Sequence, residues 1–245
     1  MSERTTAGGV PPRSVNNLPG LDYRAEAARL HAPSAPPAAP SPVPPGGIID
    51  FHTHVNGRLA AAIYADAARA FGIARVFTQV RLGDAETIRD AMLAKAPRGG
   101  PTLDFIAFPD FRHSDRWWSF TEGYLADIAA FRERFGARFI KLWNAPRLKE
   151  LFTNPDARDV TEFDGAWRVR HVELAQSLGM GVMVHVADPD TWYATKYSDA
   201  TKYGTKRDTY RGLRVMMDRF RGPWVAAHMG GSPEDLGFLD ELLTS

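Results

Sequence analysis

The sequence predicts an α/β fold in which parallel β-strands alternate with α-helices. Six short runs rich in aromatic, β-branched and other apolar residues are separated by segments with helical periodicity. These apolar runs are nearly continuous, which is typical of parallel strands buried on both faces. Three helical segments end at Gly72, Gly136 and Gly179, directly before a strand, where a left-handed residue is expected to end a helix.

The predicted elements follow one another from residue 48. The predicted strands are 48–54, 75–80, 103–108, 138–143, 181–186 and 224–228. The predicted helices are 60–71, 85–96, 121–135, 165–178 and 207–220, and a last helix is expected after Ser232 as N-cap and Pro233 as first residue. About six β-α units suit either an incomplete TIM-like (β/α) barrel, with about six of its eight units, or an open doubly wound sheet.

Residues 1–47 differ from the rest of the chain in composition. They are rich in Pro, Ala, Gly and Ser, most densely in the stretch HAPSAPPAAPSPVPPGG. Such a segment buries too little apolar surface to offset the entropy of ordering it. The sequence therefore predicts a disordered, flexible tail over 1–47 and one barrel domain over 48–245.

Composition excludes several functional classes. The chain has 245 residues, 44% of them hydrophobic, and a formal net charge of +1, which favours neither nucleic acid nor a membrane surface as partner. There is no cysteine, so any metal must be held by other ligands. No run is long and apolar enough for a membrane span, and the N-terminus has no secretory apolar segment. We expect a cytoplasmic protein that acts on a small molecule, and homo-oligomerisation stays open.

Polar residues interrupt the apolar strands near their carboxyl ends. His52 and His54 alternate along the first predicted strand and so share one face. His185 and His228 fall at the ends of the fifth and sixth predicted strands, and Lys141 falls late in the fourth. In a barrel these strand ends meet at the face where catalytic residues gather, whereas an open sheet would rarely bring all of them together. The pattern therefore favours the barrel and a metal site.

Three motifs carry this pattern, namely DFHTH at 50–54, VHVADP at 184–189 and AHMGG at 227–231. With these motifs, residues 48–245 resemble the amidohydrolase superfamily of metal-dependent TIM-barrel hydrolases. More narrowly, they resemble the amidohydrolase-related branch that includes aminocarboxymuconate-semialdehyde decarboxylase. The resemblance implies a divalent metal, zinc in most members, surrounded by the four histidines.

The resemblance also implies individual roles. His52, His54 and His185 are the expected metal ligands, together with Lys141, which matches a lysine that is carboxylated in binuclear members. His185 and His228 are the expected catalytic residues. The family also has an essential Asp at the end of an eighth strand, and because none is found here we expect the chain to be truncated at its C-terminus. Asp188 and Asp190 are not expected to replace it, since Asp188 precedes a proline and is more typical of a turn cap.

Substrate contacts are expected on the loops that follow the strands. Arg81 and Arg112 are the candidates for binding a carboxylate, because guanidinium offers a bidentate fork. Trp192 and Lys196 belong to a loop of interleaved aromatic and basic residues that either closes over an aromatic or anionic ligand or packs its own rings on the surface.

The first functional hypothesis is a hydrolase in which a metal-activated water attacks an amide, ester or lactone bond of a small molecule. The second is a lyase, a non-oxidative metal-dependent decarboxylase of a small carboxylic acid. The third is a catalytically incomplete metal-binding fragment. With two β-α units missing, the edges of the first and sixth strands are expected to make the chain aggregation-prone.

Overall fold

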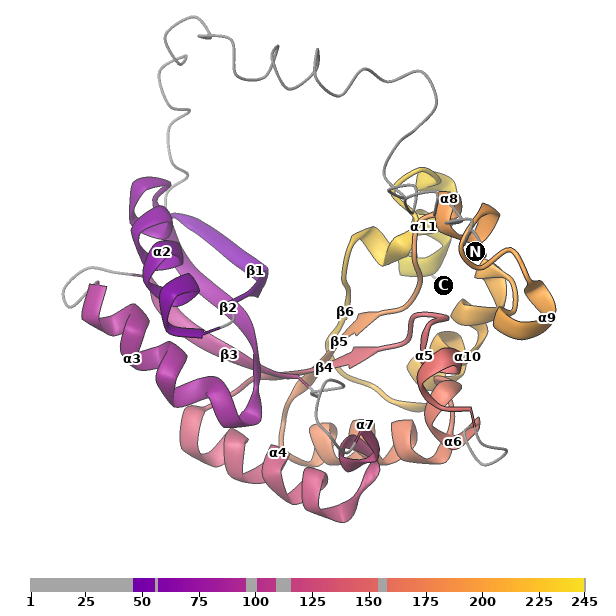
Figure 1. Cartoon of the computed structure of the whole chain (residues 1–245), viewed down its shortest axis with the longest axis horizontal. Coiled ribbons are helices and arrows are strands. Elements are labelled where there is room, and N and C mark those ends of the chain that lie inside the picture. The colour runs from indigo at the N-terminus through magenta and orange to yellow at the C-terminus, as the bar shows by residue number, and fades with distance from the viewer. Residues whose placement is uncertain (1–45, 56, 96–100, 109–115, 154–157, 245) are drawn as a thin grey trace, which may run out of the picture. The chain divides into compact units, whose positions relative to one another are not determined.

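The structure is a computed structural model, and it describes residues 46–244 except 56, 96–100, 109–115 and 154–157. Its core is a six-stranded parallel sheet whose strands follow one another in chain order (Figure 1). The strands are β1 (Ile48–His54), β2 (Ile73–Arg81), β3 (Thr102–Phe108), β4 (Phe139–Trp143), β5 (Gly181–His185) and β6 (Trp224–Ala226). Each corresponds to a predicted strand.

The longer helices also correspond to predicted ones. They are α2 (Gly57–Ala70), α3 (Ala85–Lys95), α4 (Glu122–Phe135), α7 (Ala166–Ser177), α10 (Lys206–Arg219) and α11 (Leu236–Thr244). The sequence reading missed the short helices in the connections, which are η1 (Leu82–Asp84), η2 (Arg116–Phe120), α5 (Leu148–Leu151), α6 (Arg158–Thr161), α8 (Asp190–Ala194), α9 (Ala200–Tyr203) and η4 (Met229–Gly231). Single turns leave too little periodicity to be recognised in a sequence.

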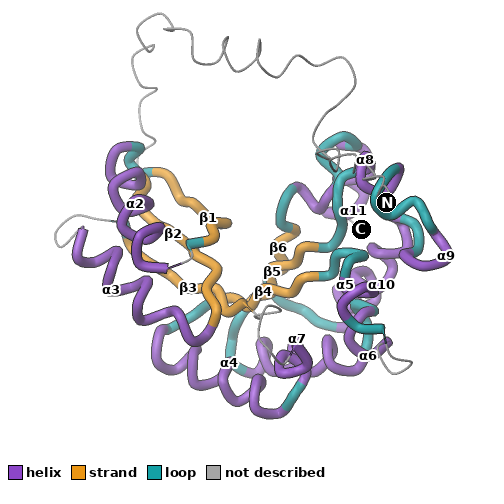
Figure 2. The backbone as a smooth tube through the Cα atoms, viewed as in Figure 1, coloured by secondary structure: helices purple, strands orange, loops and turns teal. Residues whose placement is uncertain are grey.

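The sheet curls into an open half-barrel, and helices α2, α3, α4 and α7 line its outer side (Figure 2). In a doubly wound sheet the strand order reverses at a switch point, and helices cover both faces. Here the order runs from β1 to β6 without reversal. The structure therefore confirms the partial TIM-like barrel and rejects the open doubly wound sheet.

Alternating strand residues build two different layers. The larger core contains outward-facing residues such as Ile140, Val182 and Val184 together with residues of the covering helices. A smaller cluster on the inner face contains Phe77, Ile106, Met183 and Ala227, with Phe51, Phe139 and Val225 packed against it. This alternation is the strand period of two, and it fixes which side chains can meet inside the curve of the sheet.

Strand β1 breaks this alternation at one point. Asp50 pairs with Val76 and Thr53 pairs with Thr78, so two residues of β1, Phe51 and His52, lie opposite the single residue between them on β2. This is the arrangement of a β-bulge, which redirects side chains and is common beside functional sites. The consequence is that Phe51 and His52 both lie on the inner face.

Helix ends explain several boundaries. Thr121 caps α4 by accepting a hydrogen bond from the Tyr124 amide, and Gly136 ends that helix at φ 65° as predicted. The predicted start of the last helix is wrong, because α11 begins at Leu236 and Asp235 Oδ1 accepts from the Phe238 amide at 2.9 Å. Ser232 is buried instead of serving as the cap.

Among the described residues, no helix combines the length and apolar character that crossing a membrane requires.

Candidate metal centre

The structure brings the four predicted histidines and Lys141 together at the carboxyl edge of the sheet. The ring centroids of His52 and His54 are 5.2 Å apart, and those of His52 and His228 are 4.5 Å apart. The rings of His185 and His228 are 5.1 Å apart. Lys141 Nζ lies 2.9 Å from His52 Nε2. Residues from four different strands or strand ends thus share one small region.

The bulge in β1 prepares the position of the first two histidines. Asp50 faces α2, where the Tyr64 hydroxyl donates to Asp50 Oδ2, and Asp50 Oδ1 accepts from the His52 amide at 3.1 Å. Phe51 packs on Phe77 with ring centroids 4.3 Å apart, beneath the histidines. The carboxylate and the aromatic ring therefore anchor the strand on its two faces, and His52 and His54 extend from it toward the site.

His228 reaches the site by a different route from the one predicted. The sequence reading placed it at the end of a strand over 224–228, whereas β6 ends at Ala226. His228 and Met229 adopt positive φ angles of 56° and 52°, and Gly230 and Gly231 continue the left-handed path. Non-glycine residues in this region cost roughly 1–2 kcal/mol each. The turn after β6, and not the strand itself, carries the His228 ring toward His52 and His185.

Burial and neighbouring groups lower the pKa values of His52, His54, His228 and Lys141. Desolvation, followed by the nearby Lys141, lowers the pKa of His52 to about 3. Desolvation, followed by His185 and Lys141, lowers the pKa of His228 to about 4, and desolvation and Lys141 also lower that of His54. Burial lowers the pKa of Lys141 to about 7. At neutral pH the three imidazoles therefore offer nitrogen lone pairs.

Asp188 is a site residue that the sequence reading did not assign. Its Oδ1 lies 3.0 Å from His185 Nε2, and its other carboxylate oxygen is buried without a hydrogen-bond partner. The carboxylate therefore accepts a hydrogen bond from Nε2–H of His185, which leaves Nδ1 as the nitrogen available to another ligand. The signal was present as the spacing of three residues between His185 and Asp188, but the proline after Asp188 favoured a turn cap.

The chemistry of these side chains fits a divalent metal. Neutral imidazoles are the commonest nitrogen ligands of zinc, and a carboxylate behind a ligating histidine is the usual support. In the part of the chain that the structure describes, no three His, Asp or Glu side chains are already set as a ready-made metal site. Metal binding would therefore need the side chains to move toward one another. The residues that would hold it are His52, His54, His185 and Lys141, with His228 beside them.

The predicted substrate-binding residues that the structure describes contact other protein side chains. Arg81 ends β2 at the same edge of the sheet, and its guanidinium pairs with Asp84 at 2.8 Å. Lys196 Nζ lies 4.5 Å from the Trp192 ring and 5.1 Å from the Tyr197 ring, so these residues pack on one another. Trp192 is 43% exposed. Arg112 lies outside the described residues, so its role stays a prediction.

Comparison with known proteins adds no identification, since no family model matches the chain and no curated protein matches it. The half-barrel fold and the residues that meet at its carboxyl edge are therefore the features that indicate a function.

Proposed function

We propose that this chain is a metal-dependent hydrolase of the amidohydrolase type that acts on an amide, ester or lactone bond of a small molecule. The observation that carries the proposal is the convergence of His52, His54, His185 and His228 with Lys141 at the carboxyl edge of a β/α half-barrel. That edge is where β/α barrels build their active sites. A chance grouping of these residues from separate strands is a poor alternative, because each of them interrupts an apolar strand or strand end.

The histidines of β1 and β5 bind the metal in this proposal. The neutral state of His52 and His54 at pH 7 means that no proton has to leave before their imidazole nitrogens can bind. Asp188 fixes the ring of His185 through Nε2. A Zn²⁺ held by these residues would supply a water with a pKa of about 7 and would polarise the substrate carbonyl.

In this proposal His228 is the general base and then the general acid. Its lowered pKa leaves the imidazole neutral, so a ring nitrogen can accept a proton from the attacking water. The same ring can then donate that proton to the leaving nitrogen or oxygen. Its ring is 4.5 Å from the His52 ring and 5.1 Å from the His185 ring, which places it beside the ligands.

Cationic side chains are the expected partners of a charged substrate. Arg81 could exchange its ion pair with Asp84 for one with a substrate carboxylate, and we expect the guanidinium of Arg112 to bind a carboxylate as well. Trp192 and Lys196 form the loop that would cover an aromatic or anionic group. A small molecule that carries a carboxylate is therefore the preferred substrate class.

A second candidate function is non-oxidative decarboxylation at the same site. The observation that favours it is the buried Lys141 ammonium, whose pKa of about 7 leaves a substantial cationic fraction at neutral pH. A cation inside the site can hold the carboxylate that is to be lost. A third candidate is a metal-binding module without catalysis, in which the neutral His228 would have no role.

Metal analysis of the purified full chain tests the proposal. We expect about one bound divalent ion per chain, as in mononuclear zinc sites, and its loss in the double variant His52→Ala, His54→Ala. The matched control is His171→Gln, because His171 is a buried histidine on α7 that bonds to the Ser119 carbonyl. Absence of metal from the wild-type chain, or equal metal in the double variant, would refute the proposal.

Turnover separates the three candidates. The metal-loaded chain is offered panels of small esters, lactones, amides and unsaturated or aromatic carboxylic acids. Hydrolysis that disappears in His228→Gln supports the hydrolase, and carbon dioxide release from the acids supports the decarboxylase. Metal binding without either activity supports the non-catalytic module.

A further inference from the structure

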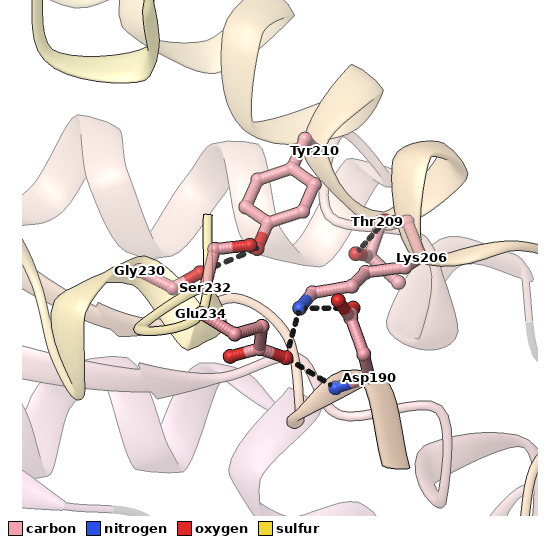
Figure 3. Close-up of polar contacts among 7 residues, drawn as sticks. All are labelled: Asp190, Lys206, Thr209, Tyr210, Gly230, Ser232 and Glu234. Carbon is pink, nitrogen blue, oxygen red and sulfur yellow. Dashed lines mark hydrogen bonds and ion pairs between the residues drawn. The ribbon is translucent and has the colours of Figure 1, made fainter. Parts of the chain in front are cut away.

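Lys206 and Tyr210 lie one turn apart on the first half of α10, so their side chains share one face of that helix. Figure 3 shows that both side chains contact residues outside α10, in the segments that follow β5 and β6. Lys206 contacts the start of α8, after β5, and the segment after η4. Tyr210 contacts the turn that follows β6. Helix α10 therefore touches the exits of both strands that supply His185 and His228.

The turn after β6 has an unusual backbone that needs support. Residues 228–231 all have positive φ, and two of them are not glycine. Within the turn, the Gly231 amide donates to the His228 carbonyl at 2.9 Å and the Ser232 amide donates to the Met229 carbonyl at 3.1 Å. These two bonds close a left-handed turn, but they do not by themselves fix where the turn lies relative to β5.

Tyr210 supplies a bond from outside the turn. Its hydroxyl donates to the Gly230 carbonyl at 2.6 Å and lies 3.4 Å from Ser232 Oγ. Tyr210 is 4% exposed, and its ring packs on Phe238 of α11 with centroids 4.6 Å apart. A buried, ring-packed tyrosine has little freedom to move, so its hydroxyl fixes the Gly230 carbonyl in space.

Lys206 ties the same turn region to the loop after β5. Its Nζ lies 2.6 Å from Asp190 Oδ1 and 3.3 Å from Glu234 Oε1. The same Glu234 oxygen accepts from the Asp190 amide at 2.6 Å. Asp190 is two residues beyond Asp188, the carboxylate that contacts His185. The ammonium therefore lies between the support of His185 and the segment that follows His228.

The two segments are also in direct contact. A side chain added at Gly231 would collide with the Ala187 carbonyl, so the backbone of the turn lies against the exit of β5. A side chain at Gly230 would press on Leu242 of α11. The close fit means that a small displacement of the turn is transmitted to the segment that carries Asp188.

We propose that Tyr210 is a positioning residue for His228, and that Lys206 extends the same brace to the loop of Asp188. Tyr210 holds the left-handed turn by its bond to Gly230, and thereby sets the distance of the His228 ring from His52 and His185. The catalytic meaning of this brace rests on the proposed function, whereas the brace itself is a property of the fold.

Nuclear magnetic resonance of the full chain with labelled histidine side chains tests the brace. The His228 resonance is assigned with His228→Gln, and the spectrum is compared for wild type and Tyr210→Phe, which keeps the ring and removes the hydroxyl. We expect the His228 signal to shift or broaden and the His171 signal to stay in place. The matched control is Tyr203→Phe, which removes another buried tyrosine hydroxyl, the one bonded to Glu150 at 2.7 Å, and should leave His228 unchanged.

Amide hydrogen exchange is a second measurement, and its first step uses the wild-type chain alone. We expect the Gly231 and Ser232 amides to be protected in the wild type and to exchange about tenfold faster in Tyr210→Phe, as expected when one hydrogen bond is lost. Lys206→Met should instead speed exchange of the Asp190 amide. Unprotected turn amides in the wild type, or an unmoved His228 signal in Tyr210→Phe, would overturn the proposal.

The outcomes separate the brace from the proposed function. The spectra are recorded on the chain as purified and again after addition of one equivalent of Zn²⁺. If the chain binds no zinc but Tyr210→Phe still moves His228, the proposed function fails and the brace stands. If zinc binds and His228 does not respond to the loss of the hydroxyl, the brace fails and the proposed function stands.

Discussion

Lys141 Nζ lies 2.9 Å from Nε2 of His52, so a buried amine and a half-buried imidazole share one hydrogen bond within the site. Lys141 is 2% exposed, and its pKa is lowered to about 7 by burial. The amine can therefore be protonated or neutral near physiological pH. This pair makes the stability of the site region sensitive to pH in a calculable direction.

Lys141→Met should stabilise the metal-free protein at acidic and neutral pH. The unfolded lysine titrates near 10.5 and the folded one near 7, so between these values the unfolded chain binds the extra proton. The penalty in the wild type is complete below pH 7 and is relieved as pH rises toward 10.5. Below pH 7 the gain in the variant is at most about 5 kcal/mol. Urea denaturation at pH 6 and pH 9 measures it, and an equal difference between variant and wild type at both values would contradict this account.

Asp188→Asn should weaken metal binding without unfolding the chain. The neutral amide supports the His185 ring less strongly than the carboxylate does, and loss of such a partner costs about 10–100-fold in metal affinity. Competition with a chromophoric chelator measures the zinc dissociation constant. Asp66→Asn on the exposed side of α2 is the control. An unchanged affinity in Asp188→Asn would show that His185 needs no carboxylate.

His171→Gln should reduce the acid sensitivity of the fold. Burial, then Arg168, lowers the pKa of His171 to about 3, while the unfolded chain titrates near 6.5. The unfolded state therefore binds more protons between these values, and stability is lost as pH falls. From pH 7 to pH 5 this one residue costs about 2 kcal/mol. Glutamine can still donate to the Ser119 carbonyl but does not titrate, so the fall in unfolding free energy over this range should be smaller in the variant.

Phe77→Ala should damage both stability and the site. Phe77 is 5% exposed and packs on Phe51 and Phe139 within the inner layer below the histidines. Truncating a buried phenylalanine costs about 3–5 kcal/mol. Thermal melts report the loss, and zinc titration reports the effect on His52. Phe77→Leu fills most of the space and should behave much more like the wild type, whereas equal loss in both variants would point to a cause other than the cavity.

Much of the fold follows from local pattern alone. The apolar runs and the glycines at helix ends placed the six strands and the long helices close to where they lie, because these signals reflect burial and backbone geometry within a few residues. The grouping of His52, His54, Lys141, His185 and His228 followed from one further rule, that parallel strands bring their carboxyl ends to one edge.

The remaining features depend on contacts between distant segments. A hydrogen bond from Tyr210 on α10 holds the left-handed turn at His228. No residue before Gly230 in this turn is of a type that predicts a left-handed conformation. The contact of Asp188 with His185 was not predicted, because an aspartate before a proline is more typical of a turn cap. The start of α11 was misplaced because Ser232, a good cap by type, is used in the contact with Tyr210.

The bulge in β1 has a consequence for how this strand tolerates change. A regular strand would put Asp50, His52 and His54 on one face, with a carboxylate directed into the apolar interior. The extra residue divides the strand into two independently phased halves, one matched to α2 through Asp50 and the other to the site. Deleting one residue between Asp50 and Thr53 would merge the halves into a single phase. The shortened strand could keep Asp50 toward α2 and both histidines toward the site only without Phe51, whose ring packs on Phe77, so the extra residue is what lets one short strand carry all four side chains.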